Sequence, residues 1–369
     1  MGVIHIENHT GLPHLLYEKT TPAGVPTDIL VIRGTFDFAQ GLAMPLSAEQ
    51  SAIVLGDRFD GPIATFPLQA VIAEEGDLLL GKPGTDVLLQ GSVHSAEGHW
   101  RTNWPVEVQV GALRKRLQIH GPRTVHKGLM GWTLSAPDKV EKVALDYRLA
   151  FGGCFYDPEP SPGQTPIPSV SYPSNTAGCG WLPSAAELNT LEASVRQRIE
   201  AQIAQLDSLP APQIEDPAHP YKAPSQRLQP VGLTALARWW QPRVGLQGTL
   251  DAQWLAERYP LLPDDFDPRF YQSAPADQVA VPYLTGDESV QLKGCLSEGD
   301  YITQLPGVAP LVVCESTDTE PFVSVPVLDT LRLDLDQRQA VLLWRLPVTA
   351  GVSQISMALV GTAALPGKA

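Results

Sequence analysis

The stretch LRLDLDQRQAVLLWRL, residues 331–346, indicates the fold class of this chain. Apolar and polar residues alternate in its first part, and an apolar run follows the polar group at 336–339. Alternation with a period of two residues is typical of β-strands, and a short polar connection between two such runs is typical of a hairpin. The stretch therefore predicts two antiparallel strands joined by a turn.

Similar strand-like patterns recur in two regions of the chain, residues 1–151 and 279–350. They lie at 28–38, 78–93, 104–113, 142–151, 279–286, 290–296, 309–316 and 323–336. Short strands at near-regular spacing predict a mainly β fold, arranged as a β-sandwich or as open-barrel-like sheets. Whether the two regions form separate domains or one composite fold stays open at this point. The remaining residues, 351–369, are expected to form a tail.

Residues 152–278 differ in composition and predict a long irregular segment rich in proline and glycine. One amphipathic helix is expected within it, from about residue 184 to 209. Ser184 and Glu187 have the spacing of a capping box, and apolar residues then recur every three or four positions. This apolar stripe either packs on the chain's own core, which we favour, or docks a partner.

The run 238–278, called here the signature segment, holds the candidate site residues. It contains three of the eight tryptophans, several prolines and the acidic group DDFD at 264–267. Tryptophan and arginine dominate interface hot spots, so we expect a partner-binding surface or a structural clasp. Its residues are Arg238, Trp239, Trp240, Arg243, Trp254, Asp264, Asp265 and Asp267. The alternative is internal packing, with the arginines paired to these aspartates.

Known catalytic and metal-binding motifs do not fit the chain. HIENH at 5–9 lacks the HExxH spacing, GKPGTD at 81–86 lacks the phosphate-loop spacing, and no GxSxG is present. Carboxylates at 264–267 could serve a glycosidase or bind calcium or magnesium, but the flanking prolines favour turns. The sequence predicts no catalytic residue, no cofactor and no metal.

Composition limits the classes of partner. The chain has 369 residues, 43% of them hydrophobic, and a formal net charge of −14. An acidic chain disfavours nucleic acids and anionic membranes, because phosphate groups would be repelled. Neither a membrane-length apolar run nor a secretory signal is evident, and four widely spaced cysteines are expected to be free and mostly buried. A cytoplasmic protein is expected.

Six separated motifs occur in order along nearly the whole chain. They are Asp77 followed by KPGTDVLLQG (82–91), RLAFGG (148–153), NTAGCGW (175–181), PQIEDP (212–217), the signature segment from WWQPR onward, and VLDTLRLDLD with VLLWR (327–345). Together they resemble the DUF2169 family, bacterial proteins often encoded beside type VI secretion components.

The resemblance implies a non-catalytic adaptor or chaperone that brings an effector toxin to the PAAR tip or the VgrG spike. The residues alone leave two other hypotheses open. One is a carbohydrate- or metal-binding enzyme on a β scaffold that uses Asp264, Asp265 and Asp267. The other is a purely structural subunit of the secretion apparatus.

Overall fold

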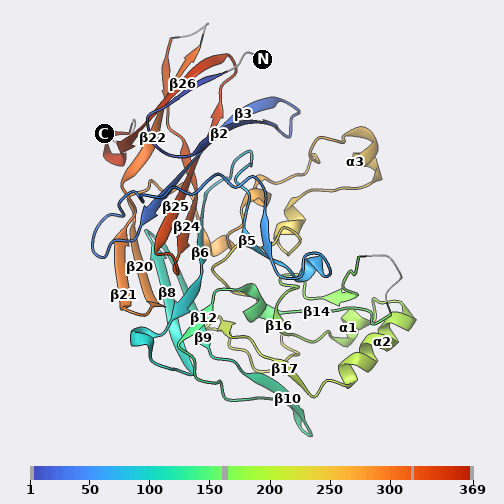
Figure 1. Ribbon diagram of the computed structural model, residues 1–369. Coiled ribbons are helices and arrows are strands. Elements are labelled where there is room, and N and C mark those ends of the chain that lie inside the picture. Colours follow the sequence, from blue (N-terminus) through green and yellow to red (C-terminus); the bar gives the residue numbers. More distant parts are fainter. Residues whose placement is uncertain (1–3, 160–164, 317–319, 366–369) are drawn as a thin grey trace.

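The computed structural model describes residues 4–159, 165–316 and 320–365, and these residues form a mainly β protein (Figure 1). The prediction of the fold class is confirmed. The largest sheet has six strands, in the order β19 (Val279–Ala280), β6 (Thr85–Gln90), β24 (Val327–Asp334), β25 (Gln339–Val348), β3 (Pro26–Asp37) and β2 (His14–Thr20). A second sheet has five, in the order β18 (Ile214–Glu215), β9 (Leu113–His120), β8 (Asn103–Val110), β20 (Ser289–Leu296) and β21 (Gly299–Gln304).

Strands from both β regions of the sequence lie in these two sheets. β6 pairs in parallel with β24, and β8 pairs in antiparallel fashion with β20. The apolar sides of the two sheets share one core, to which Leu89 and Leu342 contribute from the six-stranded sheet and Val108 and Leu292 from the other. The two regions are thus parts of one composite fold.

The predicted hairpin is confirmed as β24 and β25, with Asp334 opposite Gln339 at the turn. The side-chain Oδ1 of Asp334 accepts the backbone N–H groups of Asp336 and Gln337 at 3.0 and 2.8 Å, which stabilises the turn. Both faces of the hairpin are buried, although its first strand alternates. The polar face is therefore covered by other parts of the chain.

The expectation of a tail at 351–369 is wrong. Val352–Gly361 form β26, which lies between β1 (His5–Asn8) and β22 (Val308–Ser316) in a four-stranded sheet completed by β23 (Phe322–Ser324). Ile355 and Met357 of β26 are buried in the main core. Because its partners come from distant parts of the sequence, the strand could not be recognised from its place near the end of the chain. Residues 366–369 lie outside the described part.

The expectation of one helix at about 184–209 is also wrong. Two helices are present, α1 (Ala185–Leu188) and α2 (Ala193–Ala204), and residues 208–210 form β17 (Ser208–Pro210). The capping box at Ser184 is confirmed. The hydroxyl of Thr190 donates to the carbonyl of Glu187 at 2.7 Å, a side-chain bond that competes with helix continuation. Ile199 of α2 is fully buried, so part of the apolar stripe packs on the chain itself.

The remaining elements are short. β17 joins β10 (Thr124–Gly128) and β11 (Gly131–Leu134) in a three-stranded sheet. Two-stranded pairs are β12 (Lys142–Ala144) with β7 (Ser92–His94), β13 (Phe151–Gly152) with β16 (Cys179–Gly180), β14 (Cys154–Phe155) with β15 (Val170–Ser171), and β4 (Arg58–Asp60) with β5 (Val71–Glu74). The third helix is α3 (Ala252–Glu257), and 3-10 turns are η1 (Pro67–Gln69), η2 (Ala96–Gly98), η3 (Tyr147–Leu149), η4 (Arg243–Leu246), η5 (Pro268–Tyr271), η6 (Ala276–Gln278) and η7 (Thr362–Ala364).

Two further expectations concern the membrane and the cysteines. Within the described residues, no helix has the length and apolar character needed to cross a membrane. All four cysteines are free; Cys295 and Cys314 are buried, whereas Cys154 and Cys179 are half-buried.

Candidate functional site

Three arginines lie on one face of the six-stranded sheet, called here the arginine face. They are Arg33 of β3, Arg332 of β24 and Arg345 of β25, and all three are buried. Each belongs to an apolar or alternating strand whose neighbouring residues point into the opposite core. A buried guanidinium group is tolerated only with a counter-charge and further hydrogen bonds.

The counter-charges come mainly from residues 74–77, the acidic segment at the end of β5. Arg33 donates to Asp77 at 2.9 Å and to Glu74 at 2.8 Å, and Arg332 donates to Glu74 at 2.6 Å. Arg345 pairs with Asp329 at 2.5 Å and donates to the backbone carbonyl of Asp77 at 2.6 Å. The acidic segment is thereby fixed across the arginine face.

The arginines of the signature segment lie on the other side of the acidic segment. Arg243 is buried and donates to Glu75, to the carbonyl of Leu236 at 2.6 Å and to the carbonyl of Phe270 at 2.9 Å. Arg238 is partly exposed and contacts Glu75 at 3.4 Å and Asp57 at 3.1 Å. The alternative that paired these arginines with the aspartates at 264–267 is wrong about the partners, which are Glu75 and Asp57.

The end of the signature segment is attached to β6. The backbone N–H of Ser273 donates to Asp86 at 2.8 Å, and Lys82 donates to the same carboxylate at 2.7 Å. The Gln278 amide donates to the carbonyl of Val87 at 2.9 Å. The signature segment therefore connects the acidic segment to β6, the second strand of the six-stranded sheet, as a structural clasp would.

The three tryptophans of the signature segment have different environments. Trp240 is 0% exposed; it packs edge-on against Tyr147 and donates its Nε1–H to the Thr176 hydroxyl at 3.0 Å. Trp239 is half-buried and lies against Phe59. Trp254 lies in α3 and donates to the carbonyl of Leu261 at 2.9 Å. Trp240 is therefore a core residue and is not available to a partner in this conformation.

The aspartates of the signature segment hold turns. Asp264 pairs with Arg258 at 2.6 Å, Asp265 accepts from the backbone N–H and hydroxyl of Thr249, and Asp267 caps η5. Hydrogen bonds from the Thr249 backbone and hydroxyl lower the pKa of Asp265 below its usual range. The general acid of a glycosidase needs a raised pKa, so the lowered pKa does not suit Asp265 to that role.

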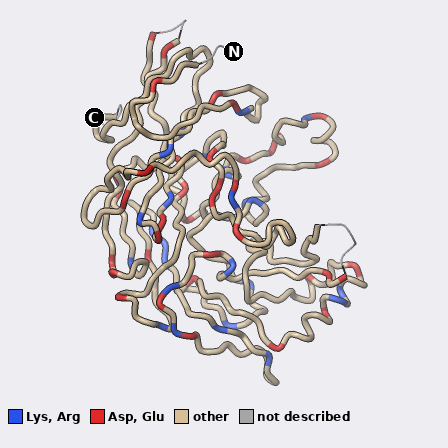
Figure 2. Tube along the Cα trace, in the orientation of Figure 1, with Lys and Arg blue, Asp and Glu red and all other residues tan. Residues whose placement is uncertain are grey.

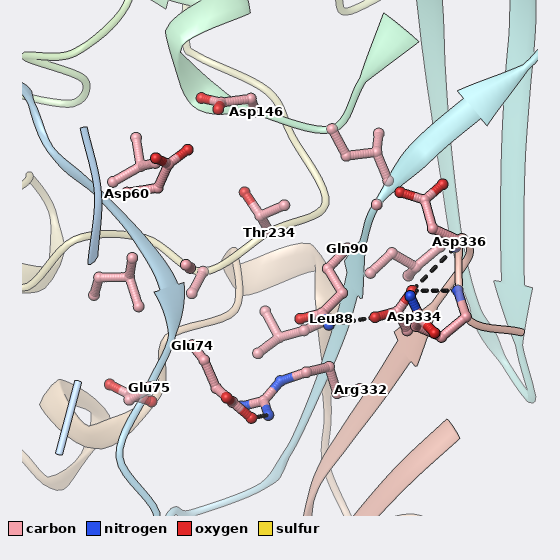
Figure 3. Close-up of a pocket in the computed structure, with 18 residues that line it drawn as sticks. Asp60, Glu74, Glu75, Leu88, Gln90, Asp146, Thr234, Arg332, Asp334 and Asp336 are labelled. Carbon is pink, nitrogen blue, oxygen red and sulfur yellow. Dashed lines mark hydrogen bonds and ion pairs between the residues drawn. The ribbon is translucent and has the colours of Figure 1, made fainter. Parts of the chain in front are cut away.

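A cavity of about 330 Å³ adjoins the arginine face between β5, β6 and β24 (Figure 3). Six carboxylates and Arg332 line it, together with apolar side chains of β5 and β6. Figure 3 shows Glu74 directed toward Arg332, and Gln90 toward Asp334, to which its amide donates at 2.7 Å. Asp60 and Asp146 also line the cavity, and both pair with Arg148, which does not line it.

The polar side chains that line this cavity are six carboxylates, Arg332, two glutamines and Thr234. Among the described residues that form it, none is a serine, cysteine, histidine or lysine, and Thr234 supplies the single side-chain hydroxyl. Burial alone would raise the pKa of Glu74, but Arg332 and Arg33 outweigh it and keep the carboxyl ionised. Within the described residues, no group of three or more His, Cys, Asp or Glu is placed to hold a metal ion.

Sequence reasoning did not select the residues that build this centre. Arg33, Glu74 and Glu75 were not noted at all. The others were noted only as part of the family motifs: Asp77, Lys82, Asp86, Asp329, Arg332 and Arg345. Several carry a recognisable signal, which is a charged residue within a mostly apolar strand, such as Arg33 in DILVIRGTF and Arg345 in VLLWRL. Such a charge is rarely left buried unless a partner is supplied elsewhere in the fold.

Glu75 is expected to make the fold sensitive to acid. Burial raises its pKa, but Lys82 and Arg243 outweigh this effect and lower the pKa from 4.5 to about 2. A carboxyl with a depressed pKa stabilises the folded state above its unfolded pKa, and this contribution, about 3 kcal/mol, is lost as the pH falls from about 4.5 to about 2. Urea unfolding across this range measures the loss.

The control for this prediction is Glu75→Gln, which cannot ionise. We expect it to be less stable than the native chain at neutral pH and to lose less stability on acidification. Equal slopes for the two proteins between pH 4.5 and 2 would assign the acid sensitivity to other carboxyls.

Comparison with protein families matches residues 23–345 to DUF2169, described as an uncharacterized protein conserved in bacteria. The match includes the arginine face, the acidic segment and the whole signature segment. Comparisons with curated proteins and with solved structures find no match to this chain.

Proposed function

Because this chain belongs to the DUF2169 family of bacterial proteins, we propose that it is a non-catalytic adaptor or chaperone that helps to load a type VI secretion effector onto the PAAR/VgrG spike tip. It would act in the cytoplasm, before secretion, by holding the effector and the spike-tip protein together.

The observation that carries this proposal is that the carboxylates of the acidic segment are paired with cations inside the fold. Glu74, Glu75 and Asp77 are all engaged with arginine or lysine side chains inside the fold. For Glu74 and Glu75 the cationic partners outweigh burial and lower the pKa, so these two carboxyls stay ionised near pH 7. These ion pairs therefore serve to hold the fold in a fixed shape, which is what a binding surface needs.

Exposed apolar side chains provide surfaces of the kind that an adaptor needs. Leu129 and Met130 occupy the turn between β10 and β11. Leu255 lies in α3, Leu250 precedes it and Tyr259 follows it. Each group belongs to a part of the chain that extends from the sheets (Figure 1). Exposed apolar residues gathered in this way are typical of protein–protein contacts.

Co-purification tests the proposal. The full chain, expressed with the PAAR, VgrG and effector proteins encoded beside it, is expected to form a stable complex with at least one of them. A PAAR protein from an unrelated gene cluster is the control and is expected to remain unbound. Failure to capture any of the neighbouring proteins would overturn the proposal.

Two other outcomes would redirect the assignment. Saturable thermal stabilisation by a sugar or a divalent cation, abolished by Asp264→Ala or Asp265→Ala, would favour the carbohydrate- or metal-binding enzyme. Stoichiometric incorporation of the chain into the assembled secretion apparatus would favour a structural subunit.

A further inference from the structure

Residues 247–266, called here the α3 lobe, form a projection whose two ends meet. The backbone N–H of Asp267 donates to the carbonyl of Leu246 at 3.0 Å, directly below the lobe. In Figure 1 the lobe extends to the right of the sheets and carries α3 at its outer end. Compact loops with joined ends often have a functional role, since they are ordered and accessible.

Internal hydrogen bonds give the α3 lobe a defined shape. Asp251 caps α3 by accepting the backbone N–H of Trp254 at 2.8 Å, and Asp265 holds Thr249 at the opposite side. Trp254 packs edge-on against Tyr259, with ring centroids 5.6 Å apart. Arg258 attaches the lobe to the body by donating to the carbonyl of Pro22 at 2.8 Å. A surface fixed in this way loses little conformational entropy on binding.

Large apolar side chains are exposed on the α3 lobe. Leu250 is 51% exposed, Leu255 is 61% exposed and Tyr259 is 64% exposed. Beside Trp254 the lobe encloses a hollow of about 410 Å³, lined also by Asp251, Glu257 and Asp265. Trp254 lines this hollow, whereas Leu250, Leu255 and Tyr259 lie outside its lining. Exposed apolar side chains of this size provide the anchor sites that dominate protein interfaces.

The charge of the α3 lobe is strongly one-sided. It contains four carboxylates and one arginine, Arg258, and that arginine is already paired with Asp264. Among the described residues, Asp251, Glu257 and Asp265 have no ion pair with a cation. Figure 2 shows the same excess of acidic over basic segments along the lobe. A complementary partner therefore carries basic side chains together with apolar ones.

We propose that the α3 lobe is the docking surface for a basic segment of the partner protein, in which Lys or Arg side chains lie next to apolar ones. A Lys or Arg side chain would enter the hollow beside Trp254 and meet Asp251, Glu257 and Asp265. Apolar residues of the same segment would cover Leu255 and Tyr259. This inference rests on the proposed function, for which it names the binding surface and the chemistry of the partner.

A second copy of the chain fits this surface poorly. Its most basic run, Arg114 to Arg116, is already engaged within the same chain. Arg114 and Arg116 each contact Glu107 at 2.6 Å, and Lys115 contacts Asp277 at 2.5 Å. Nucleic acids and anionic membranes would be repelled by the carboxylates of the lobe. A basic protein segment is the remaining class of occupant.

The test uses the full chain and two matched double variants. The lobe variant, Leu255→Ser with Glu257→Lys, removes one exposed apolar side chain and reverses one charge. The control variant, Leu42→Ser with Glu49→Lys, makes the same changes at exposed positions outside the lobe and outside the turn between β10 and β11. The free energy of unfolding of each variant is expected to lie within about 1 kcal/mol of the native value, because the altered side chains are exposed.

When the native chain captures a neighbouring spike-tip or effector protein, that complex decides the inference. The lobe variant is expected to bind at least about tenfold more weakly, whereas the control variant binds like the native chain. Equal binding by the two variants would overturn the docking surface and leave the adaptor function intact. Self-association lost in the lobe variant would instead identify a second copy as the occupant and would also overturn the inference.

When the native chain captures none of its neighbours, the proposed function fails and a peptide decides the inference. The probe is a fluorescent peptide of alternating Lys and Leu, with an alternating Glu and Leu peptide as its control. The Lys peptide is expected to bind the native chain and to bind the lobe variant at least about tenfold more weakly. Equal affinity for the lobe and control variants, or no binding, would overturn the inference.

Discussion

Replacing Arg243 by methionine is expected to lower the free energy of unfolding by about 3–5 kcal/mol. Methionine retains much of the length of the side chain but removes the charge and every hydrogen-bond donor. The carbonyls of Leu236 and Phe270 would lose their buried donors, and Glu75 would lose one of its counter-charges. Removing one member of a buried ionic group costs more than the interaction contributes, because the remaining charge stays desolvated.

Urea unfolding followed by circular dichroism measures this change. Arg269→Met is the matched control, since Arg269 is exposed and pairs with Asp267 only two residues away. Exposed ion pairs contribute little to stability, so we expect the free energy of unfolding to fall by less than about 1 kcal/mol. Similar losses for the two variants would show that Arg243 does not hold the signature segment in place.

Limited proteolysis gives an independent readout of the same prediction. Arg243 binds the carbonyls of Leu236 and Phe270, which flank most of the signature segment. Its loss is expected to expose the chain between these residues to cleavage before the sheets unfold. An unchanged cleavage pattern in Arg243→Met would contradict the role of Arg243 as a link between the two ends.

Replacing Trp240 by alanine is expected to cost about 3–5 kcal/mol, because it would leave a large cavity in the main core. Trp240 has no exposed surface, packs against Tyr147 and donates to Thr176. These partners come from residues before the signature segment. The substitution therefore weakens the attachment of that segment to the rest of the fold.

Trp254→Ala is the matched control for this prediction. It removes the same side chain from the same segment, but the ring contact of Trp254 with Tyr259 and its hydrogen bond to Leu261 both lie within the α3 lobe. We expect a loss of about 1 kcal/mol or less in global stability, measured by thermal or urea unfolding. If Trp254→Ala destabilises the chain as much as Trp240→Ala, the lobe is part of the cooperative core.

Strands with regular alternation were predictable from the sequence. The hairpin of β24 and β25, β8 and β3 all lie where the pattern places them, because side-chain alternation is a property of neighbouring residues. The helix boundaries were less predictable. α1 ends at Leu188 and α2 begins at Ala193, although the apolar spacing continues between them.

The candidate site was predictable only in part. Local capping by Asp267 is visible in its position before Pro268 and Arg269, and the structure places it at the start of η5. The roles of Trp240 and Arg243 were not visible, since the sequence favours internal packing for each residue but does not show the partners. Their burial follows from Tyr147, Thr176 and Glu75, which the fold brings to them.

The sequence by itself determined that this chain folds with β-strands in two regions and an irregular segment between them. Only the tertiary structure decided that both regions share the same sheets and that the arginine face of the six-stranded sheet is buried. The physical reason is that a buried charge needs a counter-charge, which need not be near in sequence. Arg243 and Glu75 are 168 residues apart, and Ser273 and Asp86 are 187 apart, so these pairs exist only once the sheets have formed.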